Sequence, residues 1–376
     1  MRHTTLRRAV DAACVDACLG RSPDVPDLPG VGEELVAAAR FHRIAPLVHV
    51  ALREERPDLA ALLREDRDQA LMHHVRVTTT LAAISGTLGD LSWATFKGPV
   101  LSESLHPVAG LRSYGDLDLL VAPTDLREAG DRLMEAGWRV LATPDDLLNG
   151  EVTGEIELGR PGGAVIDLHW SLVLSETLRR RFHVPTDDLL ARSVPLKIGD
   201  VGVRTFDATD TLVHLCHHAA FSGAVRLVHL VDVDQAARRI GDWDRVVQRA
   251  RAWGAAAQVG LVLARTRRVL STSLPPDLDL RLGLSRAFSR FASAVDGLRP
   301  VPSVRGEASW PRLVARAARP GVLATASHAL QNAALGAVNR ARPAAAPTRP
   351  DRAGDDDVEA WLTAVERVAG GTSANR

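Results

Sequence analysis

Two acidic residues, Asp116 and Asp118, have the type and spacing of a metal site. They stand in an acidic and apolar stretch that continues with Leu119, Leu120 and Val121. Alternate side chains of a strand share a face, so both carboxylates would project to one side. Adjacent carboxylates repel each other unless a counter-ion lies between them, and Mg²⁺ favours a few carboxylates together with substrate phosphates. The pair therefore predicts a magnesium site, with a solvated strand edge as the competing interpretation.

A third acid, Asp167, lies in the middle of a second apolar run at 164–170. This run also predicts a strand, and a buried strand accepts a carboxylate cheaply only where the group is paired or metal-bound. Three such acids meet the needs of two-metal phosphoryl chemistry, in which carboxylates bridge the ions that clamp the attacking and leaving oxygens. His169 follows two residues later on the same strand face.

Upstream of these acids, Lys97 and Gly98 follow a strand-like run at 93–96. A tight turn at this point would bring backbone N–H groups and an ammonium group to phosphates. Lysine occurs in the chain only at Lys97 and Lys197. A lysine at this turn therefore favours a particular role over a random surface charge.

Three segments carry a family resemblance. They are Phe-Lys-Gly at 96–98, Leu-Arg-Ser-Tyr-Gly-Asp-Leu-Asp-Leu-Leu-Val at 111–121 and Ile-Asp-Leu-His-Trp at 166–170. Over about residues 35–255 the chain resembles the uncharacterised nucleotidyltransferase family of bacteria, which belongs to the polymerase-beta-like nucleotidyltransferase superfamily. The Gly-Asp-Leu-Asp-Leu-Leu-Val core is the most specific part of the resemblance.

The resemblance implies a nucleotidyl-transfer fold in which Asp116, Asp118 and Asp167 hold two Mg²⁺ ions. An NMP group would pass from an NTP to an acceptor that is a small molecule, a peptide or a protein, with Asp167 nearest the acceptor. Much of the superfamily carries a Gly-Ser pair on the turn before the acids, whereas this chain has Lys-Gly-Pro at 97–99. This departure predicts different phosphate contacts.

The residues expected to contact the substrates come from several segments. Those expected at the nucleotide phosphates are Lys97, Gly98, Arg112, Ser113 and Gly115. Those expected on the acceptor side are His169 and His217.

The amino-acid composition limits which partners the protein could bind and in which cellular compartment it is expected. The formal net charge is zero and aromatic residues make up 4% of the chain, which argues against a nucleic-acid track. Three cysteines give no disulfide framework and suit a reducing cytoplasm. Acidic residues and arginines interrupt the first twenty residues, and no run of about eighteen apolar residues occurs, so neither a secretory signal nor a transmembrane helix is expected. Low lysine with high arginine is typical of a bacterial gene rich in G and C.

The periodicity predicts an α+β protein, with a mixed-sheet nucleotidyltransferase core between helical N-terminal and C-terminal segments. Residues 1–89 are expected to form a helical cap and residues 90–207 the core. Residues 208–298 are expected to form a helical C-terminal domain. Residues 299–376 read as a basic tail rich in Ala, Pro and Arg, with a short terminal helix.

Individual helices are also predicted in these segments. The apolar spacing favours one helix over 33–54 in the cap and helices at 310–318 and 322–338 in the tail, and Asp232 with Asp234 could mark a helix start.

Two hairpins are predicted inside the core. A Pro-Gly-Gly turn at 161–163 would join strands at 155–158 and 164–170, and a Gly-Asp turn would fold the stretch at 196–206. A helix at 124–137 follows the first acidic strand.

Two other functional classes remain open. A catalytically silent nucleotide-binding or partner-binding accessory module fits the altered turn, and nucleotide binding without pyrophosphate release would distinguish it from a transferase. A zinc hydrolase would use His214, His217 and His218, whose spacing could present ligands on one helix face.

Overall fold

The computed structural model of the protein describes residues 2–106, 108–148, 151–298, 300–302 and 352–373. These residues form two compact units, and the chain passes between the units several times. The sheet unit comprises the described residues of 72–104, 115–207 and 344–376, and the helical unit comprises those of 1–71, 105–114 and 208–343. Most of the expected cap and the expected C-terminal helical domain thus belong to one unit. The sequence analysis instead predicts them as separate, contiguous domains.

The sheet unit contains the predicted mixed β-sheet. Its strands, in spatial order, are β1 (Trp93–Phe96), β2 (Asp116–Val121), β5 (Val165–His169), β4 (Glu155–Gly159) and β3 (Arg139–Val140). β2 and β5 are parallel neighbours, and the other pairs are antiparallel. With helices packed around this sheet, the α+β class predicted from the sequence is confirmed.

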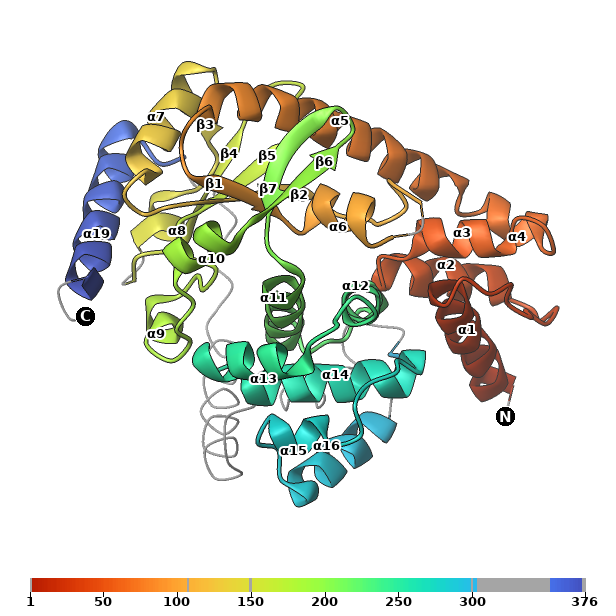
Figure 1. Cartoon of the computed structure of the whole chain (residues 1–376). Coiled ribbons are helices and arrows are strands. Elements are labelled where there is room, and N and C mark those ends of the chain that lie inside the picture. Colours follow the sequence, from red (N-terminus) through yellow and green to blue (C-terminus); the bar gives the residue numbers. More distant parts are fainter. Residues whose placement is uncertain (1, 107, 149–150, 299, 303–351, 374–376) are drawn as a thin grey trace, which may run out of the picture. The chain divides into compact units, whose positions relative to one another are not determined.

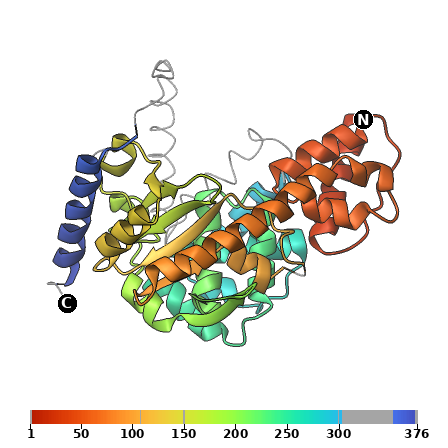
Figure 2. The ribbon, with the colours of Figure 1, turned by 90° about the horizontal axis from the view of Figure 1, so that it is seen from above.

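Strand β2 is buried on both faces. Leu117, Leu119 and Val121 are fully buried on one face, and Leu120 and Asp118 are buried on the other, since alternate side chains of a strand point to opposite sides. The long helix α5 (Arg64–Leu88) lies along the sheet in Figures 1 and 2. The backbone N–H of Ala164 donates to the Thr80 hydroxyl of this helix at 3.1 Å. Helix α5 therefore covers the sheet, and the acids alternate with the buried leucines of β2.

Shorter elements complete the sheet unit. They are α6 (Gly98–Ser104), α7 (Leu126–Glu135), α8 (Pro144–Leu148), α9 (Glu176–Arg179), α10 (Thr186–Arg192), β6 (Val194–Ile198), β7 (Val201–Thr205) and α19 (Asp355–Ser373). β6 and β7 form the second predicted hairpin, with Gly199 in the left-handed region at the turn. Helix α19 lies beside α7 (Figure 1), where Arg127 pairs with Glu359 and Glu366. The predicted terminal helix is thereby fixed to the sheet unit.

The helical unit is built from paired helices. They are α1 (Arg2–Cys18), α2 (Val31–Phe41), α3 (Ala45–Leu52), α4 (Pro57–Ala61), the start of α5, α11 (Ala208–Phe221), α12 (Leu227–Ala237), α13 (Trp243–Ala252), α14 (Ala256–Leu270), α15 (Leu278–Arg281) and α16 (Arg286–Leu298). Helices α11, α12 and α14 pack on one another as its centre. The single helix expected over 33–54 is two helices, because Arg43 adopts a positive φ of 55° between α2 and α3.

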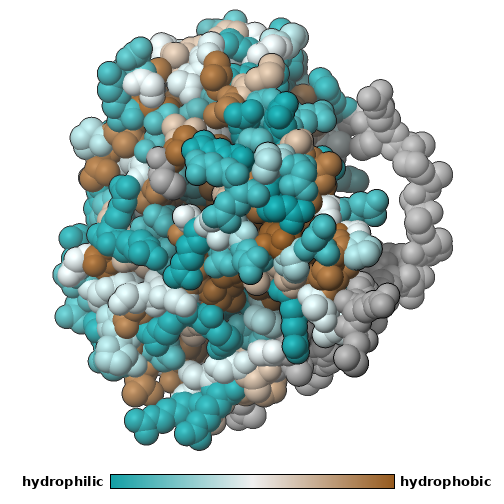
Figure 3. All heavy atoms as spheres, turned by 90° about the vertical axis from the view of Figure 1, so that its right-hand side faces the viewer, coloured by the Kyte–Doolittle hydropathy of each residue, from teal (hydrophilic) through white to brown (hydrophobic). Residues whose placement is uncertain are grey.

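No helix of the described residues is both long and apolar enough to span a membrane. Figure 3 shows one face, on which hydrophilic and hydrophobic residues are interspersed. Helices expected at 310–318 and 322–338 lie outside the residues that the structure describes.

Candidate active site

Strand register gathers acidic side chains on one face of the sheet. In the parallel pair of β2 and β5, Asp118 lies beside Asp167 and Leu120 lies beside His169. In the antiparallel pair of β4 and β5, Glu157 lies opposite Asp167 and Glu155 lies opposite His169. Side chains in register on neighbouring strands share a face. Four carboxylates and one imidazole thus line neighbouring positions on three strands.

Asp118 is the most deeply buried of these carboxylates, with 1% of its surface exposed. Lys97 Nζ lies 2.6 Å from its Oδ1, and His169 Nε2 lies 3.2 Å from the same oxygen. Burial alone would raise the pKa of the Asp118 carboxyl, but Lys97 and His169 hold it well below its usual range. Asp118 is therefore an ionised carboxylate within the fold.

His169 lies between two carboxylates. Its Nε2 faces Asp118, and its Nδ1 lies 3.0 Å from Glu155 Oε2. Burial alone would lower the pKa of His169, but the contacts with Asp118 and Glu155 raise it to about 9. Both ring nitrogens therefore carry protons at neutral pH in the metal-free protein, since each faces an acceptor oxygen.

Unlike Asp118, Asp167 forms no ion pair with any residue in the described part of the chain. Burial, together with the charge of the nearby Glu155, raises the pKa of Asp167 to about 7. Asp116 is half-buried at the start of β2 and contributes to this rise through its charge. The two acids that sequence alternation places on β2 therefore both act on Asp167.

The turn for which phosphate binding is predicted lies between β1 and α6. Lys97 adopts a positive φ of 58°, which is costly for a residue with a side chain. The following Gly98 has a φ of 26° and begins α6. The Lys97 ammonium points to Asp118, and its pKa is raised because the attraction of Asp118 outweighs the lowering effect of burial. Strained residues of this kind gather at functional sites.

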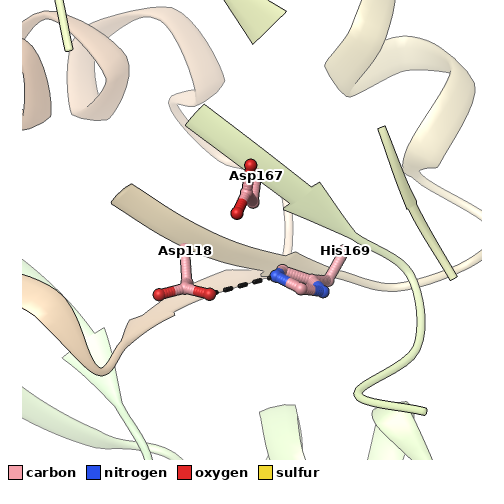
Figure 4. A group of neighbouring side chains, drawn as sticks. All are labelled: Asp118, Asp167 and His169. Carbon is pink, nitrogen blue, oxygen red and sulfur yellow. Dashed lines mark hydrogen bonds and ion pairs between the residues drawn. The ribbon is translucent and has the colours of Figure 1, made fainter. Parts of the chain in front are cut away.

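The donor set fits a divalent cation. The ligand atoms of Asp118, Asp167 and His169 all lie within 4.8 Å of one another, and Figure 4 shows the three side chains together. Two of the three donors are carboxylates, the hard ligands that Mg²⁺ prefers. Among the described residues, His214, His217 and His218 form no comparable group, so the zinc hypothesis gains no support.

The other predicted contacts lie elsewhere. Arg112 belongs to the helical unit, where its guanidinium donates to both oxygens of Asp232 at 2.8 Å. Ser113 belongs to the same unit, whereas Gly115 immediately precedes β2. His217 is buried in α11 of the helical unit, with its ring 4.7 Å from that of Phe221. The structure therefore gathers the aspartates, Lys97 and His169 in one unit, and the phosphate and acceptor roles of these residues stay predictions.

Two acids of the site, Glu155 and Glu157, were not predicted from the sequence. The sequence nevertheless contained a signal, because counting outward from a hairpin turn gives the strand register. The predicted turn centres on Gly162, and residues 157 and 167 are equally distant from it. The same count pairs residue 155 with residue 169, as the observed register does. Alternation in the first strand of that hairpin thus predicts two more acids on the site face.

Comparison with known proteins identifies the family. Residues 32–271 match the family described as uncharacterised nucleotidyltransferase. Among solved structures, an antigenic nucleotidyltransferase-like protein from Paracoccidioides brasiliensis aligns with 15% identity and a TM-score of 0.36, over 55% of this chain and 92% of that chain. No curated protein matches the chain. Because the family match spans more than half of the sequence and includes every residue of the acidic face, the chain belongs to the uncharacterised nucleotidyltransferase family.

Proposed function

We propose that the protein is a Mg²⁺-dependent nucleotidyltransferase that moves an NMP group from an NTP to a small molecule, peptide or protein. The observation that carries the proposal is the register of β2 and β5, which sets Asp118 beside Asp167 with Asp116 on the same face of β2. Within this family such a row is best explained by its chemistry, because a fold gains little from gathering carboxylates, which repel one another, in a half-buried place.

Asp116, Asp118 and Asp167 are the residues proposed to hold two Mg²⁺ ions. When bound, the ions neutralise phosphate charge and polarise the reacting oxygens. Asp118 offers an ionised carboxylate without any further proton loss, because its pKa already lies well below neutrality. Lys97 and His169 balance that carboxylate in the metal-free protein. We expect Lys97 to turn to the NTP phosphates, with the backbone at Gly98, when the site is loaded.

The transfer itself needs a base for the acceptor hydroxyl. The hydroxyl oxygen forms a bond to the α-phosphorus, the bond from that phosphorus to pyrophosphate breaks, and the hydroxyl proton passes to Asp167. Asp167 is proposed for this role because its carboxylate lies beside Asp118 on the acidic face. The proposed acceptor-side residue, His169, lies two residues further along the same strand.

The test is calorimetric titration of each NTP in the presence of Mg²⁺. We expect the wild type to bind one NTP only with Mg²⁺, and the Asp116→Asn, Asp118→Asn double variant to lose that binding. A matched control is Asp355→Asn, Asp356→Asn, which removes two charges from exposed positions at the start of α19. Absence of Mg²⁺-dependent binding for all four NTPs would overturn the proposal.

A silent nucleotide-binding module is the second candidate, and one contact favours it. The 2.6 Å pair of Lys97 and Asp118 is a buried, complete ion pair that needs no metal to balance it. Pyrophosphate release during incubation with NTP, Mg²⁺ and acceptor mixtures separates the candidates. A transferase releases it in an Asp118-dependent manner, whereas the silent module binds NTP and releases none.

A further inference from the structure

A cavity of about 470 Å³ lies within the sheet unit at the carboxyl ends of the two parallel strands. Trp170 and Ser171 of its wall directly follow His169 of β5, and Pro123 follows β2. Open sheets bind ligands beyond the carboxyl ends of their parallel strands. The volume is also typical of sites for small molecules. Two residues of the cavity wall thus directly follow the strand that carries Asp167.

The walls of this cavity combine apolar and polar residues. They come from the strand ends, from the segment that contains α9 and α10, and from α19; the apolar members are Pro123, Trp170, Phe182, Val184, Pro185, Val368 and Ala369. Thr186 at the start of α10 donates its hydroxyl hydrogen to the carbonyl of Trp170 at 2.7 Å, which ties the α9–α10 segment to β5. Such walls suit a ligand with an apolar body.

Arg179 is a cation of the cavity wall that forms no ion pair among the described residues. The guanidinium of Arg179 stacks on the Trp170 ring at 4.6 Å and donates to the carbonyls of Val173, Leu174 and Val152, all of which are neutral. Its Nε has no hydrogen-bond partner among the described residues.

The acids near Arg179 do not form an ion pair with its guanidinium. The carboxylate of Glu176 is engaged by Arg180 at 2.8 Å, and Asp187 is exposed. Glu176 and Glu151 act on Arg179 only through space, and burial lowers the pKa of its guanidinium. A half-buried cation with neutral partners attracts an anionic group of a ligand.

We propose that this cavity binds the acceptor of the nucleotidyl transfer, and that the acceptor is a small hydroxyl-bearing molecule with a carboxylate on an apolar body. The inference rests on the proposed function. The carboxylate would lie at Arg179 and the apolar body against Trp170 and α19, leaving the hydroxyl directed to Asp167. The acceptor oxygen would then bond to the α-phosphorus as pyrophosphate leaves, with the proton passing to Asp167.

The test uses matched probes. Hydroxybenzoates, hydroxyphenylacetates and hydroxyphenylpropanoates are titrated by calorimetry, each beside its neutral amide. A hydrogen bond to a charged group predicts that at least one acid binds about tenfold tighter than its amide. Arg179→Gln should remove this preference, whereas Arg181→Gln, an exposed arginine outside the cavity wall, should keep it.

A second variant keeps the test decisive if Arg179→Gln does not fold. Ala369→Trp fills the cavity from α19 and leaves Arg179 in place, so it should abolish binding of acid and amide alike. Equal affinity for every acid and its amide, or binding that survives Ala369→Trp, would overturn the inference. A dipeptide with a free carboxyl terminus tests a peptide source, and its tighter binding would overturn the small-molecule assignment.

The outcomes separate this inference from the function on which it rests. Wild-type binding of NTP with Mg²⁺, together with no preference for any acid, overturns the acceptor cavity alone. Acid-selective binding without any NTP binding overturns the proposed transfer, and with it the acceptor role.

Discussion

At the scale of single residues, the site is a chain of alternating charges. Glu155, His169, Asp118 and Lys97 follow one another at contact distances of 3.0, 3.2 and 2.6 Å. Each inner member has a partner on both sides, so its charge is balanced without solvent. Removing one member of such a buried network leaves its neighbour unpaired, and this penalty usually exceeds the value of the contact itself.

Glu155→Gln tests this network in Mg²⁺-free buffer. The pKa of His169 should fall from about 9 towards its ordinary value near 6.5. Because the folded-state pKa of His169 is raised, its stabilisation is complete below pH 6.5 and is lost as the pH rises through about 9. The variant should therefore lose ~1–2 kcal/mol of unfolding free energy at pH 6, and less above pH 9. NMR titration of the imidazole and urea unfolding at both pH values measure these effects.

The matched control is Glu157→Gln, which removes the same charge from an exposed position on the same face of β4. It should leave the pKa of His169 within a few tenths of the wild-type value, since no contact joins the two residues in the structure. Equal shifts in both variants would show that general charge, and not the contact at Nδ1, determines the protonation of His169.

The residue scale also shows what sequence can and cannot predict. Asp116 and Asp118 could be placed on one face of their strand because a period of two fixes the direction of side chains. The pairing of β2 with β5, which brings Asp167 to that face, is different, since 43 residues lie between the end of β2 and the start of β5 and nothing local fixes the register. The contact of His169 with Asp118 follows from that register. It could therefore only be found in the structure.

At the scale of elements, the turn between β1 and α6 stores strain at the site. Lys97 holds a left-handed conformation in which only glycine is unstrained, and the same residue supplies the cation for Asp118. The chain thus keeps a costly backbone state at the point where a particular side chain is needed.

Two substitutions at this position separate strain from charge. Lys97→Ala and Lys97→Gly both remove the ammonium group, but only glycine relieves the backbone. Lys97→Gly should be more stable than Lys97→Ala by ~1 kcal/mol, as shown by urea unfolding midpoints. Both should weaken Mg²⁺-NTP binding relative to wild type. Equal stability of the two variants would mean that the turn relaxes and stores no strain.

Element prediction succeeded where the signal is local. Both hairpins formed as predicted, because Gly162 and Gly199 supply the positive φ that their turns require. The helix expected over 33–54 is interrupted at Arg43, where a non-glycine residue takes a positive φ. Pro46 in the first turn of α3 was a sequence signal for this break, because proline favours the start of a helix over its interior. Asp232 and Asp234 suggested a helix start, yet both are buried inside α12, because tertiary partners outweigh the capping preference.

At the scale of the whole molecule, two units are assembled from a chain that alternates between them. A sequence read in contiguous segments predicts successive domains, and it cannot show that residues 105–114 join the helical unit while residues 72–104 and 115–207 form the sheet unit. The segment 105–114 leads directly into β2. Arg112 anchors this segment in the helical unit and lies four residues before Asp116.

The anchor is a buried triad. Arg112 donates two hydrogen bonds to Asp232, and His106 Nε2 lies 3.1 Å from the same carboxylate. Burial alone would raise the pKa of Asp232, but Arg112 and His106 hold it below its usual range. The triad therefore stabilises the fold above the ordinary pKa of an aspartate and loses that effect as the pH falls.

Arg112→Gln decides between two roles for this residue. The sequence predicts a phosphate contact, for which the variant should bind Mg²⁺-NTP more weakly at unchanged stability. The structure favours an anchor, for which it should lose ~3–5 kcal/mol of unfolding free energy because a buried carboxylate is left unpaired. Arg40→Gln breaks an exposed two-bond pair with Asp66 and should cost at most ~1 kcal/mol. In a double-mutant cycle with Asp232→Asn, an anchor gives strong non-additivity in stability, whereas additive losses would assign Arg112 to the substrate.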